Sequence, residues 1–438
     1  MAKRVMAVIL AALLVLSCAA CGSGTAAAPA EKTDSAAAEK TDSAPSADSG
    51  ETVTITWAIN ESANLTREKY TVVKDAFEAA HPNIKVELEL FTAGEMDYLT
   101  RLAAGNMPDV IHMAESISMV DGALAEIPEE LYSKWDDSAL FTAKGKHNCV
   151  PVCGQGEGMC VIYHKDQFEK YGLEEPKTYK DFLKICDTFV ENGVAPMVGF
   201  GAGDQDFFTG IWYFWNFLVN QEVNYDDFIN EAKEGKAKWN DPGLVAAVKE
   251  FQTWNSNGYF AKGSESLDYT NAEAEFLKGM APMMVDGVWA LSGLDDAEYG
   301  TFMIPDPCGS KKYPEYMCYW GVSEQCKNKD AAFEFVDWVL TGDGLQIYTD
   351  QILANDAQVS LLPGAPTYEM DPLVKEYYDT MNNDLEVFNG EPSGDAALPT
   401  GFQGYVCTEF SKIYFENADV DTIMNEMQEE YERIIAEQ

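Results

Sequence analysis

The chain has 438 residues, and its 73 acidic against 30 basic residues give a formal net charge of −43 at neutral pH. So acidic a chain is repelled by nucleic acid and by anionic lipid surfaces, which excludes nucleic acid as a partner. Hydrophobic residues make up 46% of the sequence, so the chain can build an ordinary folded core.

The N-terminus is typical of an export signal. Lys3 and Arg4 precede an apolar run over residues 5–16, which is too short to cross a bilayer at about 20 residues. Two cysteines follow among small residues, and a cysteine in this place resembles the lipobox of bacterial lipoproteins, in which the thiol carries the lipid. We expect residues 1–21 to be a lipoprotein signal with Cys21 lipidated, because two alanines precede it and a Gly-Ser-Gly stretch follows. Cys18 is the alternative lipid site, and a secreted protein cut nearby is the alternative without lipid.

Residues 22–50 contain no aromatic residue and repeat the motif Ala-Glu-Lys-Thr-Asp-Ser-Ala. Such a segment cannot bury enough surface to offset the entropy of ordering it, so we expect a flexible tether. The globular part should begin near Glu51. The predicted location is outside the cytoplasm, on the outer face of the bacterial cell membrane, with the lipid as its attachment.

The spacing of apolar residues predicts alternating strands and helices after the tether. Strands are expected over 53–57, 84–90 and 109–113, with helices over 65–80 and 96–104 between them. This order predicts βαβ units and a parallel sheet. Farther along we expect a strand over 158–163 and helices over 165–171, 179–192, 211–219, 245–255, 273–278, 331–340 and 420–436. Nearly 390 residues are long for one core and suggest two lobes.

Eight cysteines lie beyond the signal: Cys149, Cys153, Cys160, Cys186, Cys308, Cys318, Cys326 and Cys407. Disulfides are allowed outside the cytoplasm, and Cys149 with Cys153, or Cys308 with Cys318, are close enough in sequence to be candidates. Free buried thiols are an equal alternative. The spacing lacks the paired Cys-x2-Cys pattern of zinc sites, so we expect no metal and no cofactor.

Four segments in chain order carry a family resemblance. They read FEAAHPNIKV over 77–86, GNMPDVI over 105–111, IYHKDQFEKYGLEEPKTY over 162–179, and FLKGMAPM followed by DGVW over 276–289. Together they resemble the bacterial extracellular solute-binding proteins of ABC transporters, in the carbohydrate-binding, maltose-binding-protein-like family 1. His164 stands where the family usually has asparagine. The resemblance runs from about residue 53 to the C-terminus.

The resemblance implies an α/β, periplasmic-binding-protein-like fold of two lobes with a hinge and a ligand cleft between the lobes. Residues 51–153 and 306–355 would form lobe 1, and residues 154–305 and 356–438 would form lobe 2. The implied partners are a carbohydrate ligand and the membrane subunits of an ABC transporter, which recognise the closed form. The protein would act as a monomer and would not be an enzyme.

A sugar presents an apolar C–H face and a rim of hydroxyls, so its site needs flat aromatic rings and fixed carboxylates or amides. Trp289 is the leading candidate, since it follows Gly287 where the family often has a tryptophan that stacks on the ligand. Glu157, between two glycines, is the leading carboxylate. The other candidates lie after expected strands or in matching family regions: Trp57, Asn60, Glu61, Glu115, Asp204, Asp206, Trp212, Trp320, Phe402 and Gln403. Core packing is the alternative role for each aromatic residue.

Two other functions compete with carbohydrate capture. A binding protein for a peptide or a polyamine would share the fold. A lipid-anchored glycoside hydrolase would need two carboxylates about 5–10 Å apart, and with 73 acidic residues such a pair can always be imagined. The sequence contains no Gly-x-Ser-x-Gly, His-Glu-x-x-His or phosphate-binding Gly-rich motif.

Overall fold

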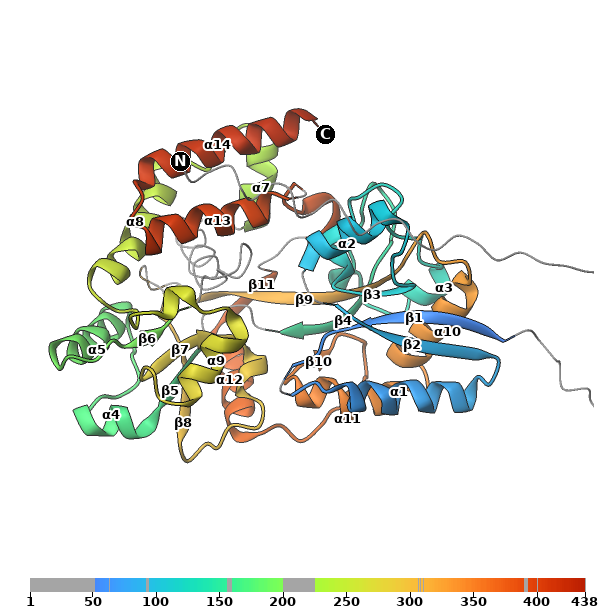
Figure 1. The fold of residues 1–438 in the computed structure, drawn as a ribbon, viewed down its shortest axis with the longest axis horizontal. Helices are drawn as coiled ribbons and strands as arrows, with labels where there is room; N and C mark the ends of the chain where they lie inside the picture. Colours follow the sequence, from blue (N-terminus) through green and yellow to red (C-terminus); the bar gives the residue numbers. More distant parts are fainter. Residues whose placement is uncertain are drawn as a thin grey trace, which may run out of the picture. The chain divides into compact units, whose positions relative to one another are not determined.

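The computed structural model describes residues 52–62, 64–91, 94–155, 160–199, 225–305, 307, 309, 311–389, 393–399 and 401–437. These belong to one compact unit, residues 50–438. Within this part of the chain the strands form two sheets, and helices pack against both (Figure 1). No helix among the described residues is long and apolar enough to cross a membrane.

The first sheet has seven strands among the described residues, in the order β10-β4-β9-β3-β1-β2, with β11 paired to β9. They are β1 (Val53–Ile59), β2 (Ile84–Leu90), β3 (Val110–His112), β4 (Val150–Gln155), β9 (Lys312–Val322), β10 (Val359–Ser360) and β11 (Glu386–Asn389). β1 runs parallel to β2 and β3, as the βαβ pattern predicts. β9 comes from far along the chain, inserts beside β3 and runs antiparallel to both β3 and β4. The sheet is therefore mixed, not purely parallel.

The second sheet has four strands in the described part of the chain, in the order β6-β7-β5-β8. They are β5 (Cys160–His164), β6 (Met197–Val198), β7 (Met283–Asp286) and β8 (Tyr299–Met303). β5 lies between β7 and β8 and runs antiparallel to both.

The helices agree with the apolar periodicity wherever both are described. They are α1 (Arg67–Ala80), α2 (Gly94–Ala104), α3 (Glu129–Tyr132), α4 (Lys165–Tyr171), α5 (Tyr179–Glu191), α7 (Tyr225–Lys233), α8 (Pro242–Ser256), α9 (Tyr269–Leu277), α10 (Lys329–Leu340), α11 (Leu345–Gln351), α12 (Pro372–Asp384), α13 (Phe402–Phe415) and α14 (Val420–Glu437). Thr178 begins α5 with a capping box, in which its side chain and that of Asp181 each bond the other's backbone N–H. The helix expected over 211–219 lies outside the described residues.

Buried apolar side chains among the described residues form four clusters, which we join into two cores according to the sheet that they contact. The first, core A, draws on residues 55–153 and 318–353 and fills the space between the first sheet and its helices, α1, α10 and α11 among them (Figure 1). The second, core B, draws on residues 160–313 and 357–431 and lies around the second sheet and helices such as α8, α13 and α14. β9 contributes to both, because Tyr313 belongs to core B and Cys318 to core A.

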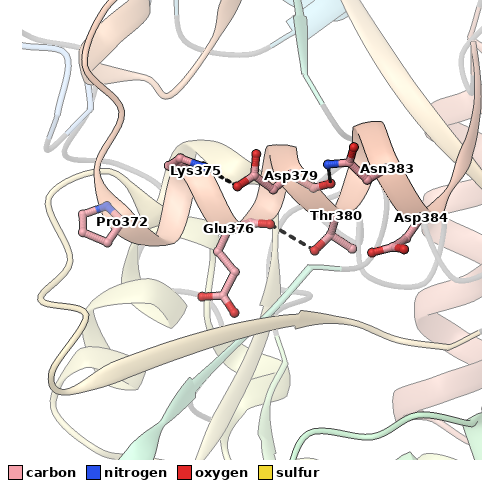
Figure 2. Close-up of a pocket in the computed structure, with 7 residues that line it drawn as sticks. All are labelled: Pro372, Lys375, Glu376, Asp379, Thr380, Asn383 and Asp384. Atoms are coloured by element: carbon pink, nitrogen blue, oxygen red, sulfur yellow. Dashed lines mark hydrogen bonds and ion pairs between the residues drawn. The ribbon is translucent and has the colours of Figure 1, made fainter.

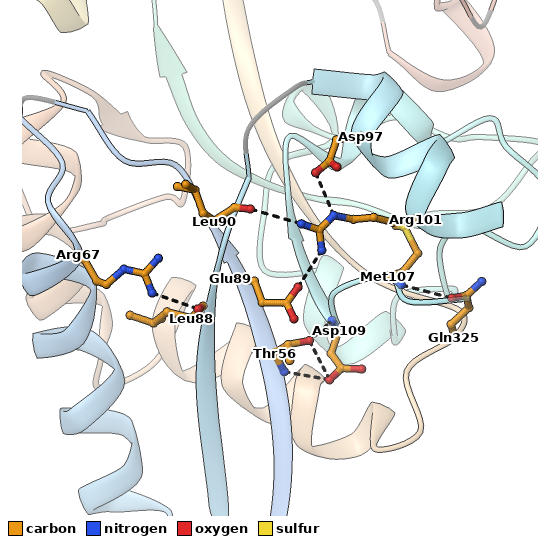
Figure 3. A network of polar contacts seen from close by, with 10 residues as sticks. All are labelled: Thr56, Arg67, Leu88, Glu89, Leu90, Asp97, Arg101, Met107, Asp109 and Gln325. Carbon is orange, nitrogen blue, oxygen red and sulfur yellow. Dashed lines mark hydrogen bonds and ion pairs between the residues drawn. The ribbon is translucent and has the colours of Figure 1, made fainter. Parts of the chain in front are cut away.

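The aspartate of the GNMPDVI segment joins β3 to β1 (Figure 3). Asp109 Oδ2 accepts hydrogen bonds from the backbone N of Thr56 at 2.9 Å and from its hydroxyl at 3.2 Å. The Thr56 hydroxyl accepts one in return from the backbone N of Asp109 at 2.8 Å. Nearby, Arg101 ties α2 to the end of β2 by binding Glu89 at 3.0 Å. These contacts fix the parallel pairing on which the loops after β1 and β3 depend.

Asp109→Ala should therefore lower the free energy of unfolding by about 1–3 kcal/mol, because it leaves the donors of Thr56 without their acceptor. Urea melts would measure the change. Asp121→Ala is the matched control, since Asp121 is an exposed carboxylate that pairs with the exposed Lys144 at 2.6 Å, and it should change stability by about 0.5 kcal/mol or less. Equal stability of the two variants would contradict the role assigned to Asp109.

Candidate functional site

The side chain of Trp289 is held in place at the end of β7. It lies in a short 3-10 turn, η4 (Val288–Leu291), and is half-buried against core B. Its indole N–H donates to the hydroxyl of Tyr269, the first residue of α9, at 2.6 Å. Its ring lies directly over Gly287, where a Cβ would collide with it. Glycine at 287 is therefore required by the ring, and the ring's orientation is fixed by two separate contacts.

A buried carboxyl group stands behind this tryptophan. The hydroxyl of Tyr269 donates to Oδ1 of Asp286 at 3.2 Å, and the backbone N of Gly287 donates to the same oxygen at 2.8 Å. Asp286 is fully buried, and its Oδ2 has no hydrogen-bond partner among the described residues. Burial is the main cause that raises the pKa of Asp286 to about 8, and the charge of Glu273 adds to it. At neutral pH this group is mainly protonated.

The segment after η4 contacts the loop that follows β1. The side-chain amide of Asn64 donates to the backbone O of Ser292 at 3.4 Å. Two predicted site residues, Asn60 and Glu61, lie in this loop and are exposed. The structure thus brings the loop of Asn60 and Glu61 close to the segment of Trp289, although the two lie more than 200 residues apart in sequence. Glu61 also pairs with Arg67 at 2.6 Å.

Trp57 and Trp320 belong to core A and are fully buried. Their ring centroids are 5.2 Å apart, and Phe335 packs against both. They line an internal cavity of only about 20 Å³, far below the several hundred Å³ of a typical ligand pocket. In this conformation neither indole presents a face to a ligand, so the packing role describes them better than the stacking role expected from sequence.

Glu115 is buried in a 3-10 turn, η1 (Ala114–Ile117), that follows β3. Its Oε2 accepts a hydrogen bond from the backbone N of Tyr319 at 3.1 Å, so this carboxylate ties η1 to β9. Met113, just before the turn, adopts a left-handed backbone with φ of 53°. Such strain in a bulky residue costs roughly 1–2 kcal/mol and is commonest at ligand sites and switch regions.

The remaining predicted site residues have mixed placements. Phe402 is fully buried in core B, with its ring 5.0 Å from that of Trp239, so its packing role is the observed one. Gln403 lies in α13. Glu157, Asp204, Asp206, Trp212 and Cys21 lie outside the described residues.

A hollow of about 440 Å³ runs along one face of α12 (Figure 2). Every lining residue belongs to that helix: Pro372, Lys375, Glu376, Asp379, Thr380, Asn383 and Asp384. Lys375 pairs with Asp379, while the side chains of Thr380 and Asn383 bond the helix's own carbonyls. Polar groups from several elements do not converge here, so we describe the hollow as a surface feature of α12. Among the described residues no group of histidine, cysteine and acidic side chains is arranged to hold a metal ion.

The sequence makes Trp289 a candidate but does not point to Asp286 and Tyr269, which the structure places beside it. A signal for Asp286 is nevertheless present, since it is a charged residue that ends the otherwise apolar run Met283–Val285. Charged residues are almost never fully buried without a partner or a function. Tyr269 gave no such signal, because its hydroxyl meets Trp289 only through the packing of α9 near β7.

The model of the bacterial extracellular solute-binding protein family matches residues 62–344. The chain belongs to this family, whose members are non-catalytic binding proteins that act outside the cytoplasm. These findings confirm the family, the absence of catalysis as a family trait and the extracytoplasmic location that were expected from the sequence.

Relatives of low identity and a solved structure with the same fold accompany the family match. The chain is similar to a maltotriose-binding protein of Pyrococcus abyssi, with 22% identity over 88% of this chain and 83% of the relative. It is also similar to the multiple sugar-binding protein of Streptococcus mutans, with 22% identity over 70% of this chain and 75% of the relative. The maltose-bound MalE3 of T. maritima superposes with a TM-score of 0.69 at 17% identity, over 87% of this chain and 100% of that one. The fold is thus the mixed α/β, periplasmic-binding-protein-like fold that was predicted.

Proposed function

We propose that this protein is the substrate-binding component of an ABC importer and that it captures a carbohydrate, an oligosaccharide in particular. The observation that carries the ligand class is the fixed indole of Trp289, held by Tyr269 and Gly287 at the end of β7. A pyranose has one apolar face, and a rigid indole stacks on it without paying to be ordered. Relatives named for maltotriose and for multiple sugars support the same class.

We place the ligand between two lobes built on the two cores. Lobe 1 takes residues 51–153 and 306–355, and lobe 2 takes residues 154–305 and 356–438. The separation of core A from core B supports this division, and so does the contact of Asn64 with Ser292, which joins loops of the two lobes. In this arrangement Trp289 supplies the stacking surface of lobe 2. Asn60 and Glu61 supply polar groups from lobe 1, and Glu157 supplies a carboxylate near the crossing between lobes.

A thermal-shift screen of mono- and oligosaccharides tests the ligand class. A ligand present at 100 times its dissociation constant adds about 2.7 kcal/mol to the free energy of unfolding, which is a clear shift in melting temperature. The screen should include short peptides and polyamines as the competing classes. Stabilisation by a peptide or a polyamine, with none by any sugar, would overturn the carbohydrate assignment and leave the family intact.

We further propose that Cys21 carries a lipid that anchors the protein to the outer face of the membrane, with residues 22–50 as the tether. Cys21→Ala should move the protein from the membrane fraction to the medium or the soluble extracytoplasmic fraction, as measured by fractionation and immunoblotting. Cys18→Ala is the matched control and should leave the protein anchored. Retention of a lipidated Cys21→Ala protein would instead assign the lipid to Cys18.

A further inference from the structure

Two buried cysteines face each other across neighbouring antiparallel strands. Cys153 of β4 is the direct register partner of Cys318 of β9. Residues opposite each other in antiparallel strands have Cα atoms about 4.5–5.5 Å apart, which is within the 4.4–6.8 Å that a disulfide requires. Both cysteines are free thiols in the structure, and they are 1% and 2% exposed.

The two thiols are in contact and have polar neighbours. Cys318 donates a hydrogen bond to the sulfur of Cys153, and Cys153 donates its own proton to Oε1 of Gln358 at 2.5 Å. Nδ1 of His112 lies 3.6 Å from Sγ of Cys318. The contact with Cys153, together with burial, holds the pKa of the Cys318 thiol well above its ordinary value, while His112 opposes that shift. The Cys318 thiol is therefore protonated at neutral pH, and the nearby imidazole can accept its proton when it reacts.

The structure favours this pairing over those expected from sequence spacing. Cys149 lies four residues before Cys153 on an extended chain, about 13 Å along a strand and beyond the reach of a disulfide. Cys308, the other proposed partner of Cys318, lies outside the described residues. Sequence spacing gives no signal for a pairing of Cys153 with Cys318, because β9 reaches β4 from more than 150 residues away.

A bond between the two cysteines would constrain the strands that connect the two cores. β4 leaves core A just before the chain enters core B at Cys160, and β9 enters core A after leaving core B at Tyr313. The two cysteines thus join two strands by which the chain passes between the cores. A covalent bond at this point would fix the register of β4 against β9.

We propose that Cys153 and Cys318 are a redox site and form a disulfide with each other, which links β4 covalently to β9. The oxidant is a small-molecule disulfide. In the first step one thiol loses its proton, and its sulfur attacks the oxidant, forming a mixed disulfide and releasing one thiol. In the second step the other cysteine, also deprotonated, attacks the mixed disulfide and releases the second thiol. Two cysteine thiols are oxidised, one external disulfide is reduced to two thiols, and the protons pass to those products.

Access to the buried pair requires local opening. Gln358, which covers Cys153, directly precedes β10, and β10 is only two residues long and lies at the edge of the sheet. Short edge elements open at low free-energy cost. We therefore expect slow oxidation of the folded protein and ready oxidation while the protein folds from the reduced, unfolded state.

Peptide mapping by mass spectrometry tests the site in the full chain. One sample is the folded protein incubated with oxidised glutathione, and the other is reduced, denatured protein refolded in a glutathione redox buffer. Both are then denatured, alkylated and digested. We expect a peptide pair linked through Cys153 and Cys318 in the refolded sample, absent after treatment with dithiothreitol. Cys186, which lies on α5 in core B, is the internal control and should be alkylated in both samples.

A stability measurement tests whether the disulfide stabilises the folded protein or forms without any effect on its stability. The oxidised protein should melt at a higher temperature than the reduced protein, because the bond restricts a long loop of the unfolded chain. This difference should vanish in Cys318→Ser and in Cys318→Ala, so a folding defect in one variant leaves the other as a test. Full alkylation of both thiols in both samples would overturn the proposal, and so would a link from Cys318 to any cysteine other than Cys153.

Discussion

Trp289→Ala should weaken binding of the best oligosaccharide by about 30- to 1000-fold, which corresponds to roughly 2–4 kcal/mol. The loss has two sources, the area that the indole buries against the sugar ring and the stacking interaction itself. Isothermal titration calorimetry with the ligand from the thermal-shift screen would measure it. The variant will also melt at a lower temperature, because Trp289 is half-buried against core B, so titration belongs well below that melting temperature.

Trp338→Ala is the matched control for this experiment. Trp338 on α10 is also a half-buried tryptophan whose ring lies over a glycine, Gly344, but it packs in core A against Phe77. Its removal should lower stability by a similar amount without changing affinity. If both variants bind normally, the cleft assignment of Trp289 is wrong. If both lose affinity equally, the loss reflects destabilisation and not a lost ligand contact.

Tyr269→Phe tests whether the orientation of the indole matters. This change removes the hydroxyl that accepts from Trp289 and donates to Asp286, while the aromatic ring remains. A lost hydrogen bond of this kind is worth about 0.5–1.5 kcal/mol, so affinity should fall by roughly 2- to 10-fold. Unchanged affinity, with a loss in Trp289→Ala, would show that the indole is a ligand contact that needs no support from Tyr269.

Much of the fold follows from local pattern in the sequence. The strict alternation over Ile84–Leu90 gives β2 with the predicted bounds, and the apolar spacing over 420–436 gives α14 to within one residue. These elements are decided by which face they bury, and that information is local. The pairing of β9 with β3 and β4 is not local, because it depends on two cores that form from distant segments. It therefore could not be read from the periodicity of either strand.

The candidate site likewise contains residues that a local sequence pattern indicates and residues whose placement depends on distant pairing. Trp289 is a candidate because a glycine and a tryptophan in the DGVW segment match a family pattern, and its ligand role stays a prediction. Trp57 is a candidate because it ends the first expected strand, and Trp320 because it matches a family region, but neither observation says which face of the sheet the side chain occupies. The register of β3 with β9, through His112 and Trp320, and that of β1 with β3, through Trp57 and Val110, place both indoles in core A. A shift of one residue along a strand moves a side chain from one face of the sheet to the other. The sequence does not specify which face either tryptophan occupies.

Asp286→Asn should stabilise the protein at pH 8 and leave it unchanged near pH 4. In the unfolded chain Asp286 ionises near pH 4, whereas in the fold its pKa is about 8. Between these values the unfolded state releases a proton that the folded state keeps, so the stability contributed by Asp286 is complete below pH 4 and is lost as the pH rises to about 8. The total is on the order of 5 kcal/mol at most, and asparagine, which does not titrate, should recover much of it. Urea melts of both proteins at pH 4, 6 and 8 would measure the difference, in which the ionisation of groups that do not interact with Asp286 cancels. Parallel profiles would mean that Asp286 is not protonated in the fold.

Asparagine at position 286 can still accept hydrogen bonds from Tyr269 and from the backbone of Gly287, as the protonated acid does, so ligand affinity should stay within a few-fold of the original. A stability gain at pH 8 without a change in affinity would therefore show that the buried charge of Asp286 destabilises the fold. It would also show that ligand binding depends on the hydrogen bonds that hold Trp289 and not on that charge.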